Sequence, residues 1–322
     1  TADLATRDPA AHRTIVSGDM GDDDINDDGN DVAETWEDIR GQNVHCLFYH
    51  PPSLALDHSA VLDGIVLTGG MANAADDPYY RGNPFGRGAG MHNERCSPTL
   101  RNCVFSGNTA VESGGGLYST EASPLVVRTS FEGNRAKHGG AAYQAREGEV
   151  FEATDCSFSG NEAENGGAIS GWGGMVLSRC SFVGNRADGG DSSTGSAIEA
   201  RGGGLDATNC LFAENDGGSR WPGASVYATC YEARIRYCTF ARNTGTVGDL
   251  KVATYSPRRP VEIAQCIFSG TGDRVSLGYD TVLFENNLVW GQSLDGFSDS
   301  NLHADPLFVE PEAGDFRLRP GS

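Results

Sequence analysis

The sequence predicts an all-β protein built as one right-handed parallel β-helix, a solenoid of about nine coils. A repeat, its composition and the lack of helical periodicity lead to this prediction. The segment Thr99 to Gly116 (TLRNCVFSGNTAVESGGG) returns in altered form from Val126, Glu152 and Leu177. Each copy is rich in Gly, Ser, Thr, Asn and β-branched residues and shows no apolar period of 3.6, so short strands joined by turns are expected. One copy cannot bury its own apolar face, and successive copies must therefore stack.

Three positions of the repeat are expected to form interior rows. Strand side chains alternate between faces, so a Cys and a Phe two residues apart point the same way. An Asn follows each Phe by three positions, where a buried amide can bond the next coil and the next Asn. Gly-Gly pairs then allow positive φ or close approach of coils. The rows are Phe105, Phe131, Phe158, Phe182, Phe212, Phe240 and Phe268; Cys103, Cys156, Cys180, Cys210, Cys238 and Cys266; and Asn108, Asn134, Asn161, Asn185, Asn215 and Asn243.

This Phe-x-x-Asn pattern with its Gly-Gly pairs resembles the repeat of polymorphic outer-membrane-protein-type β-helices. The closing segment Ala304 to Ser322 and the opening around Arg7-Asp-Pro9 are similar to those of large secreted β-helix proteins of environmental bacteria. The resemblance implies an extracellular or cell-surface location in a bacterium and a place within a longer secreted chain. It says little about activity, because one fold hosts many functions.

The chain reads as a single domain, residues 1–322, since solenoids run long as one unit. Residues 1–88 are expected to form irregular N-terminal coils with an acidic insertion at 21–41. Residues 89–270 carry the regular repeats. Residues 271–322 are expected to form the final coils and a segment, Asp305 to Arg319, that caps the C-terminal end of the stack.

Composition narrows the range of partners. The formal charge of −20 over 322 residues argues against nucleic acid and anionic membrane surfaces. No apolar run is long enough for membrane insertion. The six cysteines of the repeat row suit buried free thiols, whereas Cys46, Cys96 and Cys230 lie off the row and could pair, with nothing to identify partners.

The acidic insertion contains half of a calcium-loop pattern. Asp24, Asn26, Asp28 and Asn30 place oxygen ligands at alternate positions, and Gly29 allows the sharp turn. The twelfth position is Thr35, where the pattern has a bidentate Glu. A Ca²⁺ site and an ordinary solvated acidic loop therefore both stay open.

An outward row near the Gly-Gly pairs is the candidate site. Adjacent coils lie about 4.8 Å apart, so side chains at equivalent positions would form a continuous strip. Arg87, His138 and Arg146 are close to this strip in sequence. Its members are His92, Tyr118, Tyr143, Ser170, Glu199 and Tyr227.

Three interpretations of the strip are open. A polysaccharide lyase needs a base, an acid and a neutraliser of the uronate carboxylate: His92 or Tyr143 as base, Tyr118 as acid, and Arg87 or Arg146 as neutraliser. Alternatively, the aromatic side chains are platforms for sugar rings in a binding surface. They also simply suit an exposed strand.

In a ligand-binding surface the platforms would be Tyr118, Tyr143 and Tyr227. Lys251, near Arg234 and Arg236, is a further but weaker candidate for a lyase base, because a lone strand lysine is usually a solvated edge residue. We favour a secreted or cell-surface scaffold and adhesion module that binds polysaccharide or a cell-surface partner. The alternative is a lyase that performs β-elimination on a uronic-acid polymer. An Arg-lined groove over the strip would favour the lyase.

Overall fold

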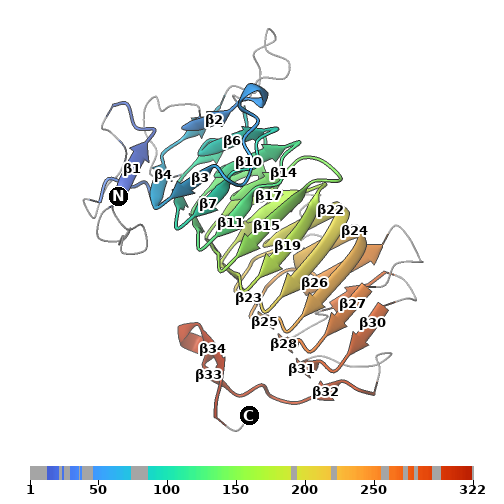
Figure 1. The fold of residues 1–322 in the computed structure, drawn as a ribbon. Helices are drawn as coiled ribbons and strands as arrows, with labels where there is room; N and C mark the ends of the chain where they lie inside the picture. The colour runs from blue at the N-terminus through green and yellow to red at the C-terminus, as the bar shows by residue number, and fades with distance from the viewer. Residues whose placement is uncertain are drawn as a thin grey trace.

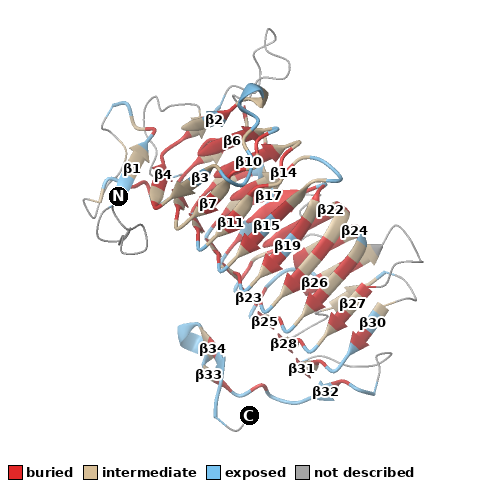
Figure 2. Ribbon diagram, viewed as in Figure 1, coloured by how far each residue is buried: buried red, intermediate tan, exposed pale blue. Residues whose placement is uncertain are grey.

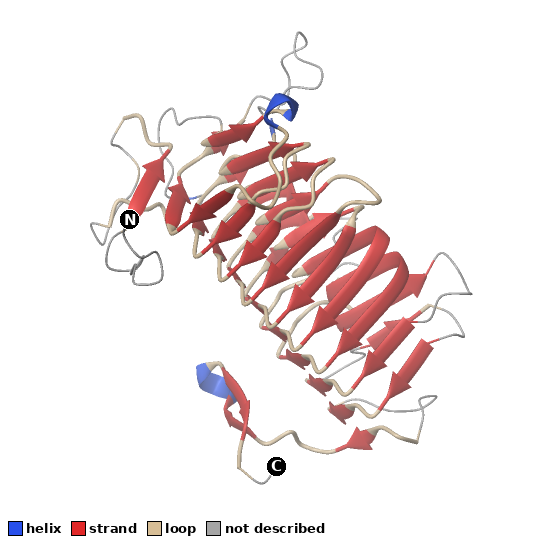
Figure 3. Ribbon diagram, in the orientation of Figure 1, coloured by secondary structure: helices blue, strands red, loops and turns tan. Residues whose placement is uncertain are grey.

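Short parallel strands stack coil upon coil along one axis and form three long sheets (Figures 1 and 3). The computed structural model describes residues 13–21, 24, 30–35, 37, 46–73, 86–189, 194–218, 223–254, 261–270, 275–278, 282–291 and 299–320. In the part of the chain that the structure describes, every pairing between strands of the stack is parallel, and the terminal hairpin alone is antiparallel. The predicted parallel β-helix is therefore confirmed.

The first sheet carries the phenylalanines of the repeat and is called the Phe sheet. Among the described residues it has eleven strands, each of two to four residues. In stack order these are β1 (Thr14–Ser17), β4 (Ile65–Thr68), β8 (Val104–Ser106), β12 (Ser130–Glu132), β16 (Ser157–Ser159), β20 (Ser181–Val183), β23 (Leu211–Ala213), β25 (Thr239–Ala241), β28 (Ile267–Ser269), β31 (Leu288–Trp290) and β32 (Leu302–His303).

The second sheet is called the wide sheet. Over the described ranges it has sixteen strands in two ladders that join in the later coils. The first ladder is β2 (Phe48–His50), β6 (Met91–Glu94), β10 (Leu117–Thr120), β14 (Ala142–Gln144), β18 (Ile169–Gly171), β22 (Ile198–Thr208), β24 (Ala224–Arg236), β26 (Gly248–Thr254) and β29 (Val275–Leu277). The second ladder shares β22 and β24 and adds β3 (Val61–Asp63), β7 (Thr99–Arg101), β11 (Leu125–Val127), β15 (Val150–Thr154), β19 (Gly174–Ser178), β27 (Val261–Ala264) and β30 (Val282–Glu285).

The third sheet, called the narrow sheet, closes each of the early coils. Its strands are β5 (Met71–Ala72), β9 (Thr109–Ala110), β13 (Arg135–His138), β17 (Glu162–Asn165) and β21 (Arg186–Ala187). Within the described part of the chain it has five strands where the Phe sheet has eleven. Some coils contribute a strand to all three sheets and others to only one or two of them. The number of complete coils therefore differs slightly from the expected nine.

The strands of the stack carry many buried residues (Figure 2), and among them are the phenylalanines of the repeat. From Phe105 to Phe268, successive rings are stacked with centroids 4.7–5.0 Å apart and interplanar angles of 2–13°. Each of these rings is fully buried. A spacing equal to the strand separation means that every coil offers the next one the same apolar surface.

The asparagine row forms a continuous amide ladder, as predicted. Asn161 shows the pattern: its Nδ2 donates to Asn185 Oδ1 (2.9 Å) and to the Phe131 carbonyl (3.0 Å). Its Oδ1 accepts from both the backbone N–H and the Nδ2 of Asn134, each at 3.0 Å. All the hydrogen-bonding positions of the amide are thus used, which offsets the cost of burying it.

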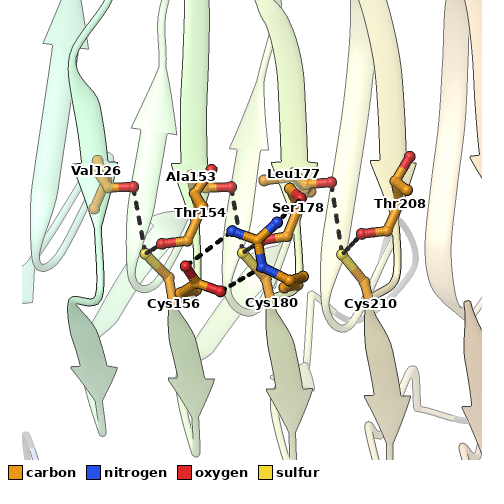
Figure 4. A network of polar contacts seen from close by, with 11 residues as sticks. Val126, Ala153, Thr154, Cys156, Leu177, Ser178, Cys180, Thr208 and Cys210 are labelled. Carbon is orange, nitrogen blue, oxygen red and sulfur yellow. Dashed lines mark hydrogen bonds and ion pairs between the residues drawn. The ribbon is translucent and has the colours of Figure 1, made fainter.

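The cysteine row consists of free thiols, and the off-row cysteines are free as well. Figure 4 shows the pattern for three coils: Cys180 Sγ lies 3.4 Å from the carbonyl of Ala153 in the preceding coil and 3.4 Å from that of Ser178. Thr129 fills the row where a cysteine is missing, and its hydroxyl donates to the Val127 carbonyl. The position therefore requires a small side chain that can donate to a carbonyl, not a disulfide.

One turn of the repeat receives the N-terminal segment. Val32 and Ala33 are buried there, and Ser106 Oγ donates to the Ala33 carbonyl at 2.8 Å. Gly133 (φ 57°) lies so close that a Cβ would clash with the Glu34 carbonyl, whereas Gly160 (φ 60°), one coil further, faces open space. The first glycine is thus needed for close approach as well as for positive φ.

The C-terminal segment is not the cap that the sequence led us to expect. Residues 305–319 contain a hairpin of β33 (Phe308–Glu310), η6 (Pro311–Ala313) and β34 (Asp315–Leu318), and η3 (Pro52–Leu54) is the other short helix described. The hairpin folds back along the Phe sheet, where Phe308 and Phe316 cluster with Ala213 and Ala241 (Figure 1). Docking against the small side chains of that sheet buries both aromatic rings, which stabilises the hairpin there.

Replacing Asn161 with Ala should destabilise the protein strongly. The change removes the partner of the Phe131 carbonyl and the acceptor of the Asn134 backbone and side-chain N–H groups in a buried site, while Asn185 keeps the backbone N–H of residue 161. Each group left unpaired costs about 1–3 kcal/mol. We expect a loss of about 3 kcal/mol or more in the free energy of unfolding, measured by urea denaturation. The exposed Asn73→Ala variant is the control and should change it by less than about 0.5 kcal/mol. Equal effects of the two substitutions would contradict the ladder's role.

Candidate functional site

The predicted strip exists and is longer than expected. Strand pairing aligns His92 with Tyr118, and Tyr118 with Tyr143, in the first ladder of the wide sheet. The register then continues without a gap into later coils. We call the whole set the outer row: Tyr49, His92, Tyr118, Tyr143, Ser170, Glu199, Tyr227, Lys251 and Ser276.

The rings of the outer row pack on one another. Ring centroids lie 5.3 Å apart for Tyr49 and His92, 4.7 Å for His92 and Tyr118, and 5.8 Å for Tyr118 and Tyr143, the last pair being parallel within 3°. His92 and Tyr118 are each only 5 % exposed, while Tyr143 is half-buried. Tyr118 and Tyr143 stack face to face, so those ring faces are not available to a ligand. The pair presents its ring edges and a hydroxyl group to solvent, and not open ring faces.

The two arginines proposed as neutralisers occupy different places. Arg87 lies over the Tyr118 ring at 5.5 Å and pairs with Glu112 through Nε at 2.5 Å. Arg146 pairs instead with Glu121 at 3.0 Å, and Glu121 also accepts from Arg95 at 2.6 Å. The structure thus brings Arg87 to the outer row and directs Arg146 to a neighbouring ion pair.

Burial shifts the pKa values of two side chains of the outer row, His92 and Tyr143. It lowers the pKa of His92 to about 4, helped by the Arg87 charge and opposed by a hydrogen bond with the Arg87 backbone. The same desolvation, with the nearby Tyr118 and Glu199, raises the pKa of the Tyr143 hydroxyl. Both side chains are therefore neutral at physiological pH.

A buried polar network lies at the centre of the outer row, and the sequence did not predict it. Glu199 is 2 % exposed and accepts from Ser170 Oγ at 2.6 Å, from Arg201 Nε at 2.9 Å and from the Thr194 hydroxyl. Thr194 belongs to a second row, which continues through Asn165 to His138 with contacts of 2.9 and 3.4 Å. The carboxylate is fully paired, which is the condition for burying a charge.

Arg201 also connects this network to an exposed ring. Its guanidinium lies 6.0 Å from the centre of the Trp172 ring, and Trp172 is 41 % exposed. Burial lowers the pKa of His138, which lies beside the network. The arrangement offers Trp172 and the half-buried Tyr143 and Tyr227 to a ligand, with the charge of Arg201 already balanced by Glu199.

Beside the outer row, a groove of about 350 Å³ crosses four coils of the narrow sheet. Inward-facing alanines such as Ala136 and Ala163 leave backbone as its floor. Its walls carry charges in pairs, Arg135 with Glu162 at 3.5 Å and Lys137 with Glu164 at 3.9 Å. Lys137 and Glu164 directly precede His138 and Asn165, so the groove and the polar network are adjacent.

The calcium pattern lies partly outside the described residues, which exclude Asn26 and Asp28. The Asn30 side-chain oxygen accepts from the Val32 N–H at 2.7 Å, and the Asp24 N–H donates to Asp19 at 3.1 Å. No group of three His, Cys, Asp or Glu suited to a metal occurs in the part of the chain that the structure describes. The Ca²⁺ site stays a prediction.

Comparison with known proteins identifies the fold. Residues 87–289 match a family model described as a right handed beta helix region. Searches of curated proteins and of solved structures returned no match. Within the described ranges, none of the helices is both long and apolar enough to cross a membrane.

The buried His92 should make stability depend on pH. Its folded pKa of about 4 lies below the ordinary value of 6.5, so the unfolded chain binds the extra proton first as the pH falls. Stability is therefore lost between pH 6.5 and pH 4, by about 3 kcal/mol for this one group. We would measure the free energy of unfolding of the wild type and of His92→Gln by denaturation across this pH range. The decrease should be smaller in the variant by about 3 kcal/mol. Parallel profiles would show that His92 titrates normally.

Proposed function

Since the chain belongs to the family of right-handed β-helix regions, we propose that it is a β-helical scaffold that binds a polysaccharide along its axis. The polymer lies over the outer row and in the adjacent groove of the narrow sheet. We place this activity outside the cell, on a secreted or surface-displayed protein, in keeping with the sequence resemblance described above.

The groove is the observation that carries this proposal. It crosses four coils parallel to the stack, so equivalent groups recur at about 4.8 Å intervals along it. Its walls present guanidinium and ammonium donors beside carboxylate acceptors, as in the Arg135–Glu162 pair. Hydroxyl groups of a sugar both donate and accept, and such mixed pairs suit them. An extended glycan can therefore repeat the same contacts coil after coil.

A lyase is the weaker alternative. Its base and acid would have to reach a polymer, yet His92 and Tyr118 are each 5 % exposed. Its neutraliser would need free positive charge, but Arg87 is paired with Glu112 and Arg201 with Glu199. Lys251 lies in the outer row and contacts Ser276 at 3.0 Å. The face is thus nearly neutral in sum, which favours binding of an uncharged polymer over elimination from a uronate.

Affinity electrophoresis against neutral polymers and uronic-acid polymers tests the proposal. We expect retardation by at least one neutral polymer and about a thirtyfold loss of affinity in a Glu162→Gln, Glu164→Gln double variant. Replacing each charged acceptor by a neutral one costs about 1 kcal/mol per hydrogen bond, and two such losses give about 2 kcal/mol. The exposed Glu132→Gln, on the Phe sheet, is the matched control and should bind as the wild type does.

Two outcomes would contradict the proposal. Folded protein that binds no polymer of the panel would remove the binding function. A rise in ultraviolet absorbance from unsaturated uronate, lost in Tyr143→Phe, would replace it by the lyase.

A further inference from the structure

A second hollow lies on a different face, between the C-terminal hairpin and the Phe sheet. Its volume is about 300 Å³, and Trp290, Leu307, Phe308 and Phe316 supply its apolar part. Ligand pockets have this size and an aromatic lining with a few polar groups. Neither the outer row nor the groove of the narrow sheet contributes to it.

The register of the Phe sheet explains why the hollow exists. Ala213, Ala241, Ser269 and Trp290 occupy one outward position in consecutive coils. The rings of the hairpin pack on the two alanines. The next position holds only a serine and the following one a large indole, so a space remains between the hairpin and Trp290, which is 41 % exposed.

Arg242 fixes the hairpin over this space. Its Nη1 donates to the Pro311 carbonyl at 2.6 Å and lies 3.3 Å from the Glu312 carboxylate. Its Nε lies 3.5 Å from Glu214. Arg242 has φ 55° at a repeat position that holds glycine in the four coils from Gly107 to Gly184 and Glu214, with φ 56°, in the next coil. The left-handed conformation, which disfavours a side chain, is thus kept at the two positions whose side chains pair with each other under the hairpin. The pocket is thus preformed.

The charges around the pocket restrict its ligand. Arg242 and Arg319 supply positive groups, and Asp305 and Glu312 negative ones. An anion would meet two carboxylates on a protein of net charge −20, and a cation would meet two guanidinium groups. A wholly apolar ligand would desolvate all four charges without replacing their hydrogen bonds.

We propose that this pocket binds one neutral sugar ring, as a free monosaccharide or as the end residue of a glycan. Its apolar face packs on the Trp290 indole, and its hydroxyls donate to the carboxylates and accept from the guanidinium groups. The site is separate from the polymer surface proposed above and does not depend on it.

Titration calorimetry with neutral monosaccharides, with glucosamine and with galacturonate tests the pocket. We expect one neutral sugar to bind with a Kd on the order of 1 mM, and Trp290→Ala to weaken binding at least about tenfold. Ser269→Leu fills the hollow while keeping its aromatic and charged lining groups, and should abolish binding. Tyr231→Ala, in β24 of the wide sheet and equally exposed at 41 %, is the control and should have no effect. Trp172→Ala separately reports any sugar bound on the wide sheet.

Each other result overturns the inference. No neutral sugar bound by folded wild type, or binding of a charged sugar only, rejects the pocket's ligand class. Binding lost in Trp172→Ala but kept in Trp290→Ala would place the sugar on the wide sheet instead. Polymer binding that survives Trp290→Ala and Ser269→Leu while monosaccharide binding is absent would leave the polymer proposal standing and this one rejected.

Discussion

The amide ladder is the interaction on which the rest of the structure depends. A carboxamide can satisfy all its hydrogen bonds inside the protein only if the next carboxamide lies one strand spacing away and in the same orientation. From Asn108 to Asn243 this condition is met in every coil, and Asn243 then donates to Asp249 at 2.9 Å. The ladder therefore fixes not only the distance between coils but also their register, and stacked phenylalanines fill the space beside it.

Register also creates the surface. A slip of one residue in any coil would exchange its inward and outward side chains, so the same constraint that aligns Asn161 with Asn185 aligns Tyr143 with Ser170 and Glu199. The outer row and the pocket at Trp290 both exist because the buried ladders fix which side chains of each coil face outward. The two sites differ in how they treat charge. On the wide sheet a buried carboxylate, Glu199, is paired with the partly exposed Arg201, whereas the pocket leaves the Glu312 side chain 90 % exposed.

The sequence predicted what recurs and missed what does not. Phe and Asn repeat every 24–30 residues, so the fold, the ladder and the alignment of His92 with Tyr118 followed from spacing alone. Lys251 follows Tyr227 by 24 residues, so the same spacing could have placed it in the outer row. Tyr49 could not be placed in this way, because a long insertion separates it from His92 and breaks the repeat spacing. The bonds of Glu199 to Thr194 and Arg201, and the turn of Arg146 toward Glu121, depend on side-chain rotamers. The return of the C-terminal hairpin to Ala213 depends on a contact about a hundred residues distant, which no repeat encodes.

The cysteine row bears on how such a chain changes length over evolution. The one S–H of each thiol in the row lies within reach of two carbonyls, one two residues earlier in the chain and one in the coil before it, as Cys180 does with Ser178 and Ala153. Such a contact is complete between any two neighbouring coils, whereas a disulfide would commit two particular cysteines to each other. A whole coil can thus be duplicated or deleted without orphaning a covalent partner. An inserted or deleted coil would disturb only the surface features that join several coils, namely the Glu199 network and the contacts of the docked hairpin.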